Sequence, residues 1–439
     1  MGFDFDFFVL FKSPNKLSQY PLHILASVVS KDDSSSNFAH LLSVLSEECP
    51  ISLLALDKRD RSPLSIAISR QAADAAALIL KKIVASTERR PKPLPEFDAV
   101  SGSGSPVFLA LSCGMNSLAI EMLERNLLSV SSLIGSGSSV DGSTALHLAA
   151  QAANVRVAEL LFASATEPAA RQAMCAVRDK AQMTPLLCAA LGGSAELMKM
   201  LLPYSDAKVQ DNQQRTLFMC AAIGGKLDCV ELALQQEGFN VNSLDSTGRS
   251  ALVAACREGS AGVAQLLINR GANVALCDVT GISCLMAACM AHNLECVKVV
   301  LAAKGGVDLI KMVDKNKRDA LHFAVESFPV DSEKTDLVAL LLSAGAKVSS
   351  SGQLFTAVSK GSVPLTTLLL KNGADPNAVD RQSGSTALHV AVSKGLIPII
   401  LTLKQAGAWS SVKNSAGETP LSIAVSQKKK DIVILLSEQ

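Results

Sequence analysis

Aromatic side chains are scarce in this chain of 439 residues: they make up 4% of it, with one Trp and two Tyr. Hydrophobic residues nevertheless account for 49%, so the apolar content is mostly Ala, Leu, Val and Ile. Side chains this small suit helices that pack closely against one another. Because a single compact core does not grow to this length, the chain forms either several domains or an array of repeats.

An excess of one sign of charge is also absent. Forty-one basic residues oppose forty acidic residues, and the net charge is +1. Such a chain has no overall field that would attract nucleic acid or an anionic membrane. We therefore expect no nucleic-acid partner, and any recognition that depends on charge must be local.

Long hydrophobic runs are missing as well. No uninterrupted apolar stretch reaches the roughly 18 residues that a membrane-spanning helix needs. The amino terminus, MGFDFDFFVLFK, has neither the basic cluster nor the cleavage site of a signal peptide. Asp6 stands where the myristoylation motif has Ser or Thr. We expect no membrane insertion, and a location in the cytoplasm or the nucleus.

Motifs of catalytic, metal and phosphate sites are absent too. The eleven cysteines are an odd number and show no CxxC pair of a zinc site. No GxxxxGK[ST] motif occurs, and GSGSSV at 135–140 has Val140 where GxGxxG needs glycine. Flexible connections between early repeats are the better interpretation of this stretch. The same holds for SGSGS at 101–105 and RRPKPLPEFD at 89–98. We expect no cofactor, no metal and no enzymatic activity.

What the chain does contain is one motif that returns many times. DGSTALHLAA at 141–150 aligns with QMTPLLCAA at 182–190, QRTLFMCAA at 214–222, GISCLMAAC at 281–289 and GSTALHVAV at 384–392. We call the position of the threonine in TALH the register mark. Its spacing is 32 to 40 residues from Thr144 onward and 39 to 43 before it, so the first copies carry longer insertions. The register marks are Tyr20, Ser62, Ser105, Thr144, Thr184, Thr216, Ser250, Ser283, Asp319, Gly352, Thr386 and Thr419.

The residue types at these positions have physical reasons. Ser or Thr at the mark can cap a helix amino terminus, and proline follows it at Pro63, Pro185 and Pro420, where a missing N–H costs nothing. Alanine pairs after the mark let neighbouring helices approach closely. One copy cannot bury its own faces, so the copies must stack. The glycines that follow leucine-rich runs, where a left-handed helix end is favoured, are Gly271, Gly345, Gly373 and Gly407.

A second half of the unit is also present, in GVAQLLINRGANV at 262–274, VALLLSAGAKV at 338–348 and LTTLLLKNGADPN at 365–377. With both halves in register, the sequence resembles the ankyrin repeat family, whose unit of about 33 residues has a turn, a TPLHxAA helix and a second helix. About twelve copies cover roughly residues 18–439. The resemblance implies an all-α solenoid of helix-turn-helix repeats with short β-hairpin-like turns.

The organisation that we predict has three parts. Residues 1–17 are an amino-terminal segment, residues 18–140 are divergent ankyrin-like repeats with long insertions, and residues 141–439 are the ankyrin repeat array. The copy marked by Asp319 inserts SFPVDSEKT between its helices, and the turn before Gly352 is about five residues short, so we expect it to be truncated. The segments 165–177 and 129–139 indicate further insertions or an extra helix.

The histidines of the motif are predicted to be structural. His147 shares its slot with His23, His322 and His389, whereas Leu187 stands there in another copy. A residue that is interchangeable with leucine is not catalytic. The resemblance implies that this histidine bonds to backbone near the turn.

The cysteines of the motif are predicted to be small core residues. Cys188 and Cys220 stand four residues after the mark, and Cys256 and Cys289 six after it, in slots where other copies have small residues. Cys277 and Cys284 flank a turn, and we expect them to be more exposed.

By the resemblance, a partner binds on the concave face, through the turn tips and the exposed end of the first helix. The contact slots are four, three and one residues before the mark and seven and eight after it. These slots vary in the chain while the framework does not, and they mix apolar residues with arginine, as binding hot spots do. The predicted partner-binding residues are Met183, Leu191, Arg215, Ile223, Arg249, Arg257, Ile282, Met290, Lys315 and Arg318.

Two alternatives remain open for these surfaces. Neighbouring repeats could partly bury Met183, Leu191 and Ile223. A second, basic set in an early repeat is either another binding surface or an ordinary solvated turn. Its members are Lys58, Arg59, Arg61 and Arg70.

For the function, we expect a non-enzymatic protein-protein interaction scaffold or adaptor, a monomeric array that holds a protein partner on its concave face. The alternative is a regulatory ankyrin array of a larger signalling or membrane-trafficking protein. The final copy stops at LLSEQ without a polar capping repeat, which favours that alternative.

Overall fold

The computed structural model describes residues 14–15, 18–28, 41–46, 53–59, 61–87, 105–125, 127, 141–236, 238–329, 335–348, 351–380 and 383–437. These residues form helices and turns, and their only β-structure is three isolated antiparallel bridges. The chain divides into two compact units, Met1–Phe239 (unit 1) and Asn240–Gln439 (unit 2). The fold is therefore all-α, as predicted, and the two units are described separately.

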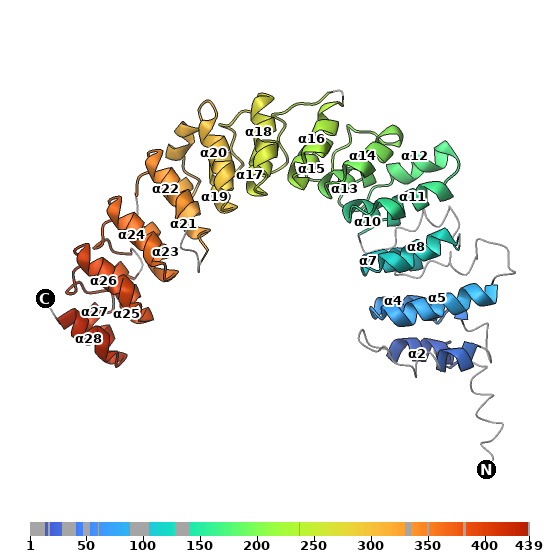
Figure 1. Ribbon diagram of the computed structural model, residues 1–439, viewed down its shortest axis with the longest axis horizontal. Helices are drawn as coiled ribbons and strands as arrows, with labels where there is room; N and C mark the ends of the chain where they lie inside the picture. The colour runs from blue at the N-terminus through green and yellow to red at the C-terminus, as the bar shows by residue number, and fades with distance from the viewer. Residues whose placement is uncertain are drawn as a thin grey trace, which may run out of the picture. The chain divides into compact units, whose positions relative to one another are not determined.

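Unit 1 contains two rows of helices, blue to green in Figure 1. Each helix of the first row packs against the next helix of that row, and the second row lies beside it. The first helices are α2 (Pro21–Val28), α4 (Pro63–Ser69), α7 (Pro106–Ser112), α10 (Ala145–Gln151), α13 (Pro185–Leu191) and α15 (Leu217–Gly224). The second helices are α5 (Ala73–Thr87), α8 (Asn116–Glu124), α11 (Val155–Ser164), α14 (Ala195–Leu201), with η2 (Leu202–Tyr204) after it, and α16 (Leu227–Leu234).

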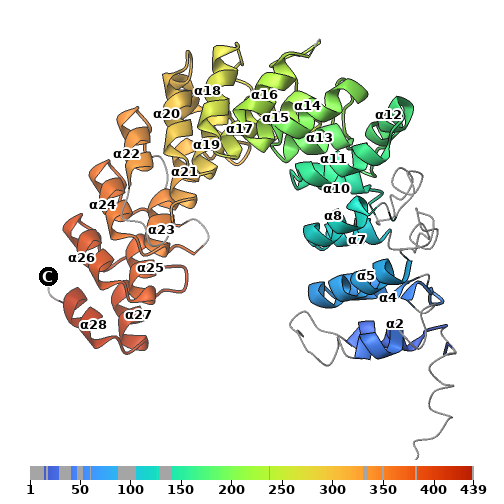
Figure 2. The same ribbon diagram turned by 45° about the vertical axis from the view of Figure 1, so that its right-hand side comes forward.

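Unit 2 repeats this arrangement, and its two rows run side by side in both views (Figures 1 and 2). The first helices are α17 (Ala251–Arg257), α19 (Cys284–Met290), α21 (Ala320–Glu326), α23 (Ser351–Ser359), α25 (Ala387–Lys394) and α27 (Pro420–Ser426). The second helices are α18 (Ala261–Asn269), α20 (Leu294–Ala302), with η3 (Val307–Lys311) after it, α22 (Asp336–Ser343), α24 (Val363–Lys371), α26 (Ile397–Gln405) and α28 (Lys430–Ser437).

The register marks define where the first helices begin. Eleven of the twelve marks lie directly before a helix. The hydroxyl of Thr184 accepts a hydrogen bond from the Leu187 amide, and Ser283 does the same for Met286, so both cap their helices as predicted. The exception is Gly352, because α23 already begins at Ser351.

The glycine helix ends are also confirmed. Gly271, Gly345, Gly373 and Gly407 have φ angles of 84°, 103°, 89° and 88°. Glycine adopts this left-handed conformation without the steric cost that a Cβ atom brings.

Both kinds of irregularity expected from the sequence occur. An extra helix, α12 (Pro168–Ala176), lies between α11 and α13 and packs against α13 and η2. Only seven residues separate α22 from α23, compared with fourteen between α18 and α19, so the turn before α23 is truncated as predicted. The segment 129–139 and the connections at 89–98 and 135–140 lie outside the described residues, as do residues 101–104 of SGSGS.

The core consists of small aliphatic side chains and cysteines. Cys188 is 7% exposed, and Cys220, Cys256 and Cys289 are fully buried, which confirms them as core residues. Burial raises the pKa of Cys188 and of Cys220 to about 12, so both remain thiols.

The prediction that Cys284 is more exposed is wrong. Cys277 is half-buried, but Cys284 is fully buried, and its Sγ lies 3.4 Å from the Val274 carbonyl oxygen. The residue directly after the register mark is the first of its helix and faces the core. Ala320, in the same slot, is also fully buried.

Candidate protein-binding surface

A short turn, which we call the finger, precedes the first helices, and in five copies it is closed by an acidic residue five positions before the mark. The Oδ1 atom of Asp245 accepts the amide N–H groups of Thr247 at 2.8 Å and Arg249 at 3.0 Å. The carboxylate thus accepts hydrogen bonds from the backbone amides two and four residues after it, and these bonds hold the turn in one conformation. The residues that close fingers in this way, the turn aspartates, are Asp57, Asp211, Asp245, Asp278 and Asp314.

Three of the predicted partner-binding arginines are bound to these turn aspartates. The Nε atoms of Arg215, Arg249 and Arg318 donate to the aspartate four residues before them, at 2.6, 3.0 and 3.0 Å. Arg318 also lies over the Phe323 ring, 4.5 Å from its centre. These guanidinium groups stabilise the fingers, and only part of each side chain, 18%, 24% and 37%, is exposed.

The same contacts shift the titration of the turn aspartates. Burial alone raises the pKa of Asp57, but hydrogen bonds from the Arg61 side chain and from the backbone of Arg61 and Arg59 outweigh it and lower the pKa to about 2. The pKa values of Asp245 and Asp314 are also lowered, because hydrogen bonds from their fingers outweigh burial in the same way.

We therefore predict acid sensitivity. A carboxyl whose pKa is lower in the folded chain contributes stability that is fully present above its unfolded pKa of about 4, and this is lost as the pH falls below that value through the folded pKa. The urea midpoint should decline over this range. In Asp245→Asn/Asp314→Asn the decline should be shallower, as urea titrations monitored by circular dichroism at each pH would show. Identical slopes for both proteins would contradict the assignment.

The remaining predicted residues differ in exposure. Met183 and Ile282 are buried, with 6% and 7% of their surface exposed. Leu191, Ile223 and Met290 are half-buried, whereas Arg257 and Lys315 are exposed. For Met183 this burial matches the alternative that neighbouring repeats cover it.

Within each unit, the structure brings predicted residues together in neighbouring repeats. In unit 1, Leu191 and Ile223 stand near the ends of α13 and α15, which pack together. In unit 2, Arg257 and Met290 are the last residues of α17 and α19, which also pack together. Lys315 belongs to the next finger, where its amide donates to the Thr280 carbonyl at 3.0 Å. We call the fingers and the exposed ends of the first helices the first-helix face of each unit.

The motif histidines bond across repeats. The Nε2 atom of His147 lies 3.0 Å from the Met183 carbonyl oxygen, and its Nδ1 atom lies 2.8 Å from the Thr144 hydroxyl. His389 and His23 contact the carbonyl oxygens of Glu418 and Arg61 at the same distance. Burial lowers the pKa of His147, which favours its neutral form. The structural role predicted for this slot is confirmed in these three copies.

Two features were not predicted from the sequence: the pairing of finger arginines with turn aspartates, and the exposure of Trp409. Each Asp-x-x-x-Arg pair could have been found, because it recurs at one place in the register, as in Asp211 and Arg215. In the basic early set, Arg61 is likewise bound to Asp57 at 2.8 Å, while Lys58, Arg59 and Arg70 are exposed. Trp409, the single tryptophan, is 63% exposed in the loop after α26, outside the contact slots.

Among the residues that the structure describes, no group of three or more His, Cys, Asp or Glu side chains is placed to hold a metal ion. The described helices include none that is both long and apolar enough to cross a membrane.

Comparison with known proteins connects this architecture to a family. The profile described as Ankyrin repeats (3 copies) matches residues 104–211, 204–278, 261–351 and 354–439. Over 146 residues the chain is 35% identical to the B-cell lymphoma 3 protein homolog of Mus musculus, and over 153 residues it is 33% identical to the nuclear factor NF-kappa-B p105 subunit of Gallus gallus. These alignments cover 31% and 33% of this chain, but only 31% and 15% of the two relatives.

Solved ankyrin repeat domains were found as well. That of Bcl-3 matches with a TM-score of 0.42 and 32% identity, and that of human ASB11 with a TM-score of 0.43 and 25% identity. Each match covers 51% of this chain and 99% of the solved chain. The repeated profile match over most of the sequence decides the assignment, and the chain belongs to the ankyrin repeat family.

Proposed function

We propose that the chain is a non-enzymatic protein-protein interaction scaffold or adaptor that holds a protein partner on the first-helix face. The exposure of the first helices is the observation that carries the proposal. In α13 and α19 every residue is buried except the last, Leu191 or Met290, which is half-exposed. The framework therefore presents a limited set of side chains, and stacked repeats line these up as an extended binding surface.

The side chains presented there suit recognition of another protein. Unit 1 offers the apolar pair Leu191 and Ile223, and unit 2 offers Met290 together with the cations Arg257 and Lys315. Apolar anchors with nearby Arg are the composition found at binding hot spots. Because Arg215, Arg249 and Arg318 are bound to turn aspartates, we assign them mainly to shaping the fingers.

The test is partner capture with face variants. Partners would first be recovered with the unchanged chain by affinity purification and mass spectrometry. Their affinity would then be measured for the unchanged chain and for two face variants, Leu191→Glu/Ile223→Glu and Arg257→Glu/Met290→Glu/Lys315→Glu. We expect at least one of these variants to lose about tenfold or more in affinity. A glutamate would replace either an apolar side chain that the partner covers or a cation that attracts the partner.

Matched controls are Leu227→Glu on α16 and Leu401→Glu on α26, which change exposed leucines of second helices. They should keep the affinity, and circular dichroism should show the same helix content in all variants. Equal recovery of partners by both face variants, or equal loss in the controls, would reject the first-helix face.

A regulatory ankyrin array of a larger signalling or membrane-trafficking protein is the second candidate. The length of the relatives favours it, since the match covers 15% of the NF-kappa-B p105 subunit. Sequencing of full-length transcripts would discriminate the two. We also propose a monomer located in the cytoplasm or the nucleus, without a nucleic-acid partner, which sedimentation and imaging of a tagged chain would test.

A further inference from the structure

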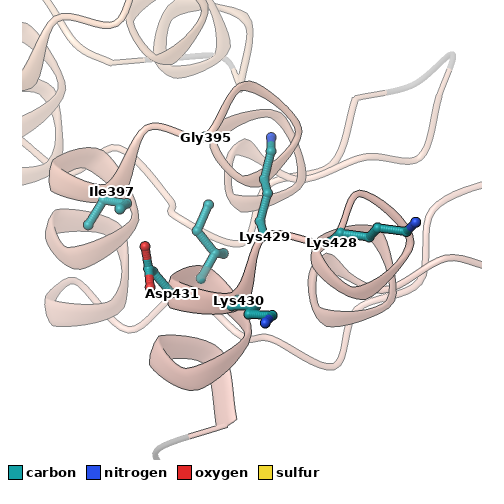
Figure 3. A pocket seen from close by; sticks show the side chains of 7 residues that line it. Gly395, Ile397, Lys428, Lys429, Lys430 and Asp431 are labelled. Atoms are coloured by element: carbon teal, nitrogen blue, oxygen red, sulfur yellow. The ribbon is translucent and has the colours of Figure 1, made fainter.

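A cavity of about 490 Å³ lies in the last two repeats of unit 2 (Figure 3). It is lined by Gly395, Ile397 and the segment 428–432, where α25 turns into α26 and α27 turns into α28. Its volume falls in the range of ligand pockets, about 300 to 1,000 Å³. A first helix begins at its finger and ends at this turn, so the cavity is at the opposite end of the first helices from the fingers.

The repeats around this cavity are basic, although the whole chain has a net charge of +1. Residues 387–439 contain six lysines, no arginine and three acidic residues, Glu418, Asp431 and Glu438, so their net charge is +3. No ion pair within the described chain involves Lys428, Lys429 or Lys430, while Asp431 is the acidic residue of the cavity wall. A hollow bordered by unneutralised cations concentrates anions locally.

One of these lysines is held in place by the fold. The Nζ atom of Lys429 donates to the carbonyl oxygens of Val392 at 2.9 Å and Ser393 at 2.7 Å, at the end of α25. An ammonium group has three N–H donors, so these two bonds leave one for a ligand. Figure 3 shows Lys429 extended towards the loop of Gly395, while Lys428 and Lys430 project from the rim.

Lys428 occupies a backbone position that favours glycine. It stands nine residues after its register mark and has a φ of 58°. The left-handed conformation is costly for residues with a Cβ atom, and Gln71, Ala153 and His292 are the other exceptions. In the remaining copies with positive φ, glycine stands there: Gly114, Gly193, Gly225, Gly259, Gly361 and Gly395. The last repeat thus places a cation at the rim where a neutral glycine would fit the backbone better.

We propose that this cavity binds an acidic segment of a partner protein, whose carboxylates pair with Lys428 and Lys430 while an apolar side chain contacts Ile397. Ile397 is 38% exposed, and buried Ile432 forms the apolar floor. A continuous polyanion such as nucleic acid fits less well, because Asp431 stands in the wall and the lining has no aromatic side chain on which bases could stack. The predicted partner-binding residues of the first-helix face stop at Arg318, whereas this site lies at the turns after α25 and α27, so it goes beyond the function proposed above.

The experiment uses the full chain and a short fluorescein-labelled peptide with glutamates on both sides of one leucine. Fluorescence anisotropy at low salt should show binding that weakens as salt is added. Lys428→Glu/Lys430→Glu should weaken binding about tenfold or more, and Lys428→Arg/Lys430→Arg should retain it. The matched control is Lys199→Glu/Lys208→Glu, which changes two exposed lysines of unit 1 and alters the net charge equally.

A further variant separates binding from folding. Lys428→Gly removes a rim cation and relieves the left-handed backbone, so it should weaken peptide binding without lowering the melting temperature. The face variants of the proposed function should still bind the peptide. No binding by the unchanged chain, equal weakening in the unit 1 control, or tighter binding of a single-stranded oligonucleotide than of the peptide would overturn the proposal.

Discussion

Replacing Asp245 by alanine should lower the free energy of unfolding of unit 2 by about 3 kcal/mol. The carboxylate is only 7% exposed and accepts hydrogen bonds from the Thr247 amide and hydroxyl and from the Arg249 amide and Nε. Alanine would leave these donors without an acceptor at the base of a finger. Urea unfolding would measure the loss, and hydrogen exchange would show faster opening at α17, the helix that follows this finger.

Two matched variants distinguish the contribution of Asp245 to stability from that of Arg249. Arg249→Ala leaves both amides bound to the carboxylate and should cost only about 1 kcal/mol, because the guanidinium remains partly exposed. Asp245→Asn should fall between the two, since its amide oxygen can still accept from backbone. If Arg249→Ala costs as much as Asp245→Ala, the turn aspartates do not organise the fingers.

The second large effect concerns Gly224, at the end of α15. A Cβ atom there would overlap the carbonyl oxygen of Ala190 and come within 3.0 Å of that of Leu191, both on α13. Backbone atoms cannot rotate away as a side chain can, so Gly224→Ala should destabilise unit 1 by about 3 kcal/mol through overpacking. Thermal and urea unfolding of the purified variant would measure this loss.

A control with the same chemical change should have the opposite sign. Gly262 is an exposed residue within α18. Gly262→Ala should stabilise the chain by up to about 1 kcal/mol, because alanine favours the helix. A Gly224→Ala variant as stable as the unchanged chain would show that α13 and α15 do not approach as closely as described.

The framework could be predicted because each of its signals is local. A hydroxyl at the register mark caps a helix in any copy, as Thr184 does, and a glycine such as Gly373 ends one wherever the chain turns left-handed. The truncated turn before α23 and the extra helix α12 also followed from counting residues against the repeat. For the same reason, His147 could be recognised as structural from the slot that it shares with leucine.

The candidate surface was less predictable, because exposure depends on the neighbouring repeat. Met183 and Ile282 occupy contact slots by position, yet the chain around them leaves only 6% and 7% of their surface exposed. Its contact slot predicts Arg215 as a partner-binding residue, but the buried Asp211 holds its guanidinium in the finger. Gly224 occupies a contact slot too, and the neighbouring helix leaves no room there for a side chain.

The repeat, its register, its helix ends, its structural histidines and its Asp-x-x-x-Arg pairs can therefore be predicted from the amino-acid sequence, because they depend on contacts within a copy or on a slot that recurs. The folded chain was needed to show which contact slots reach solvent and that three consecutive lysines border a cavity in the last two repeats. Exposure and the cavity arise from the packing of one copy on the next, where the side chains differ from copy to copy.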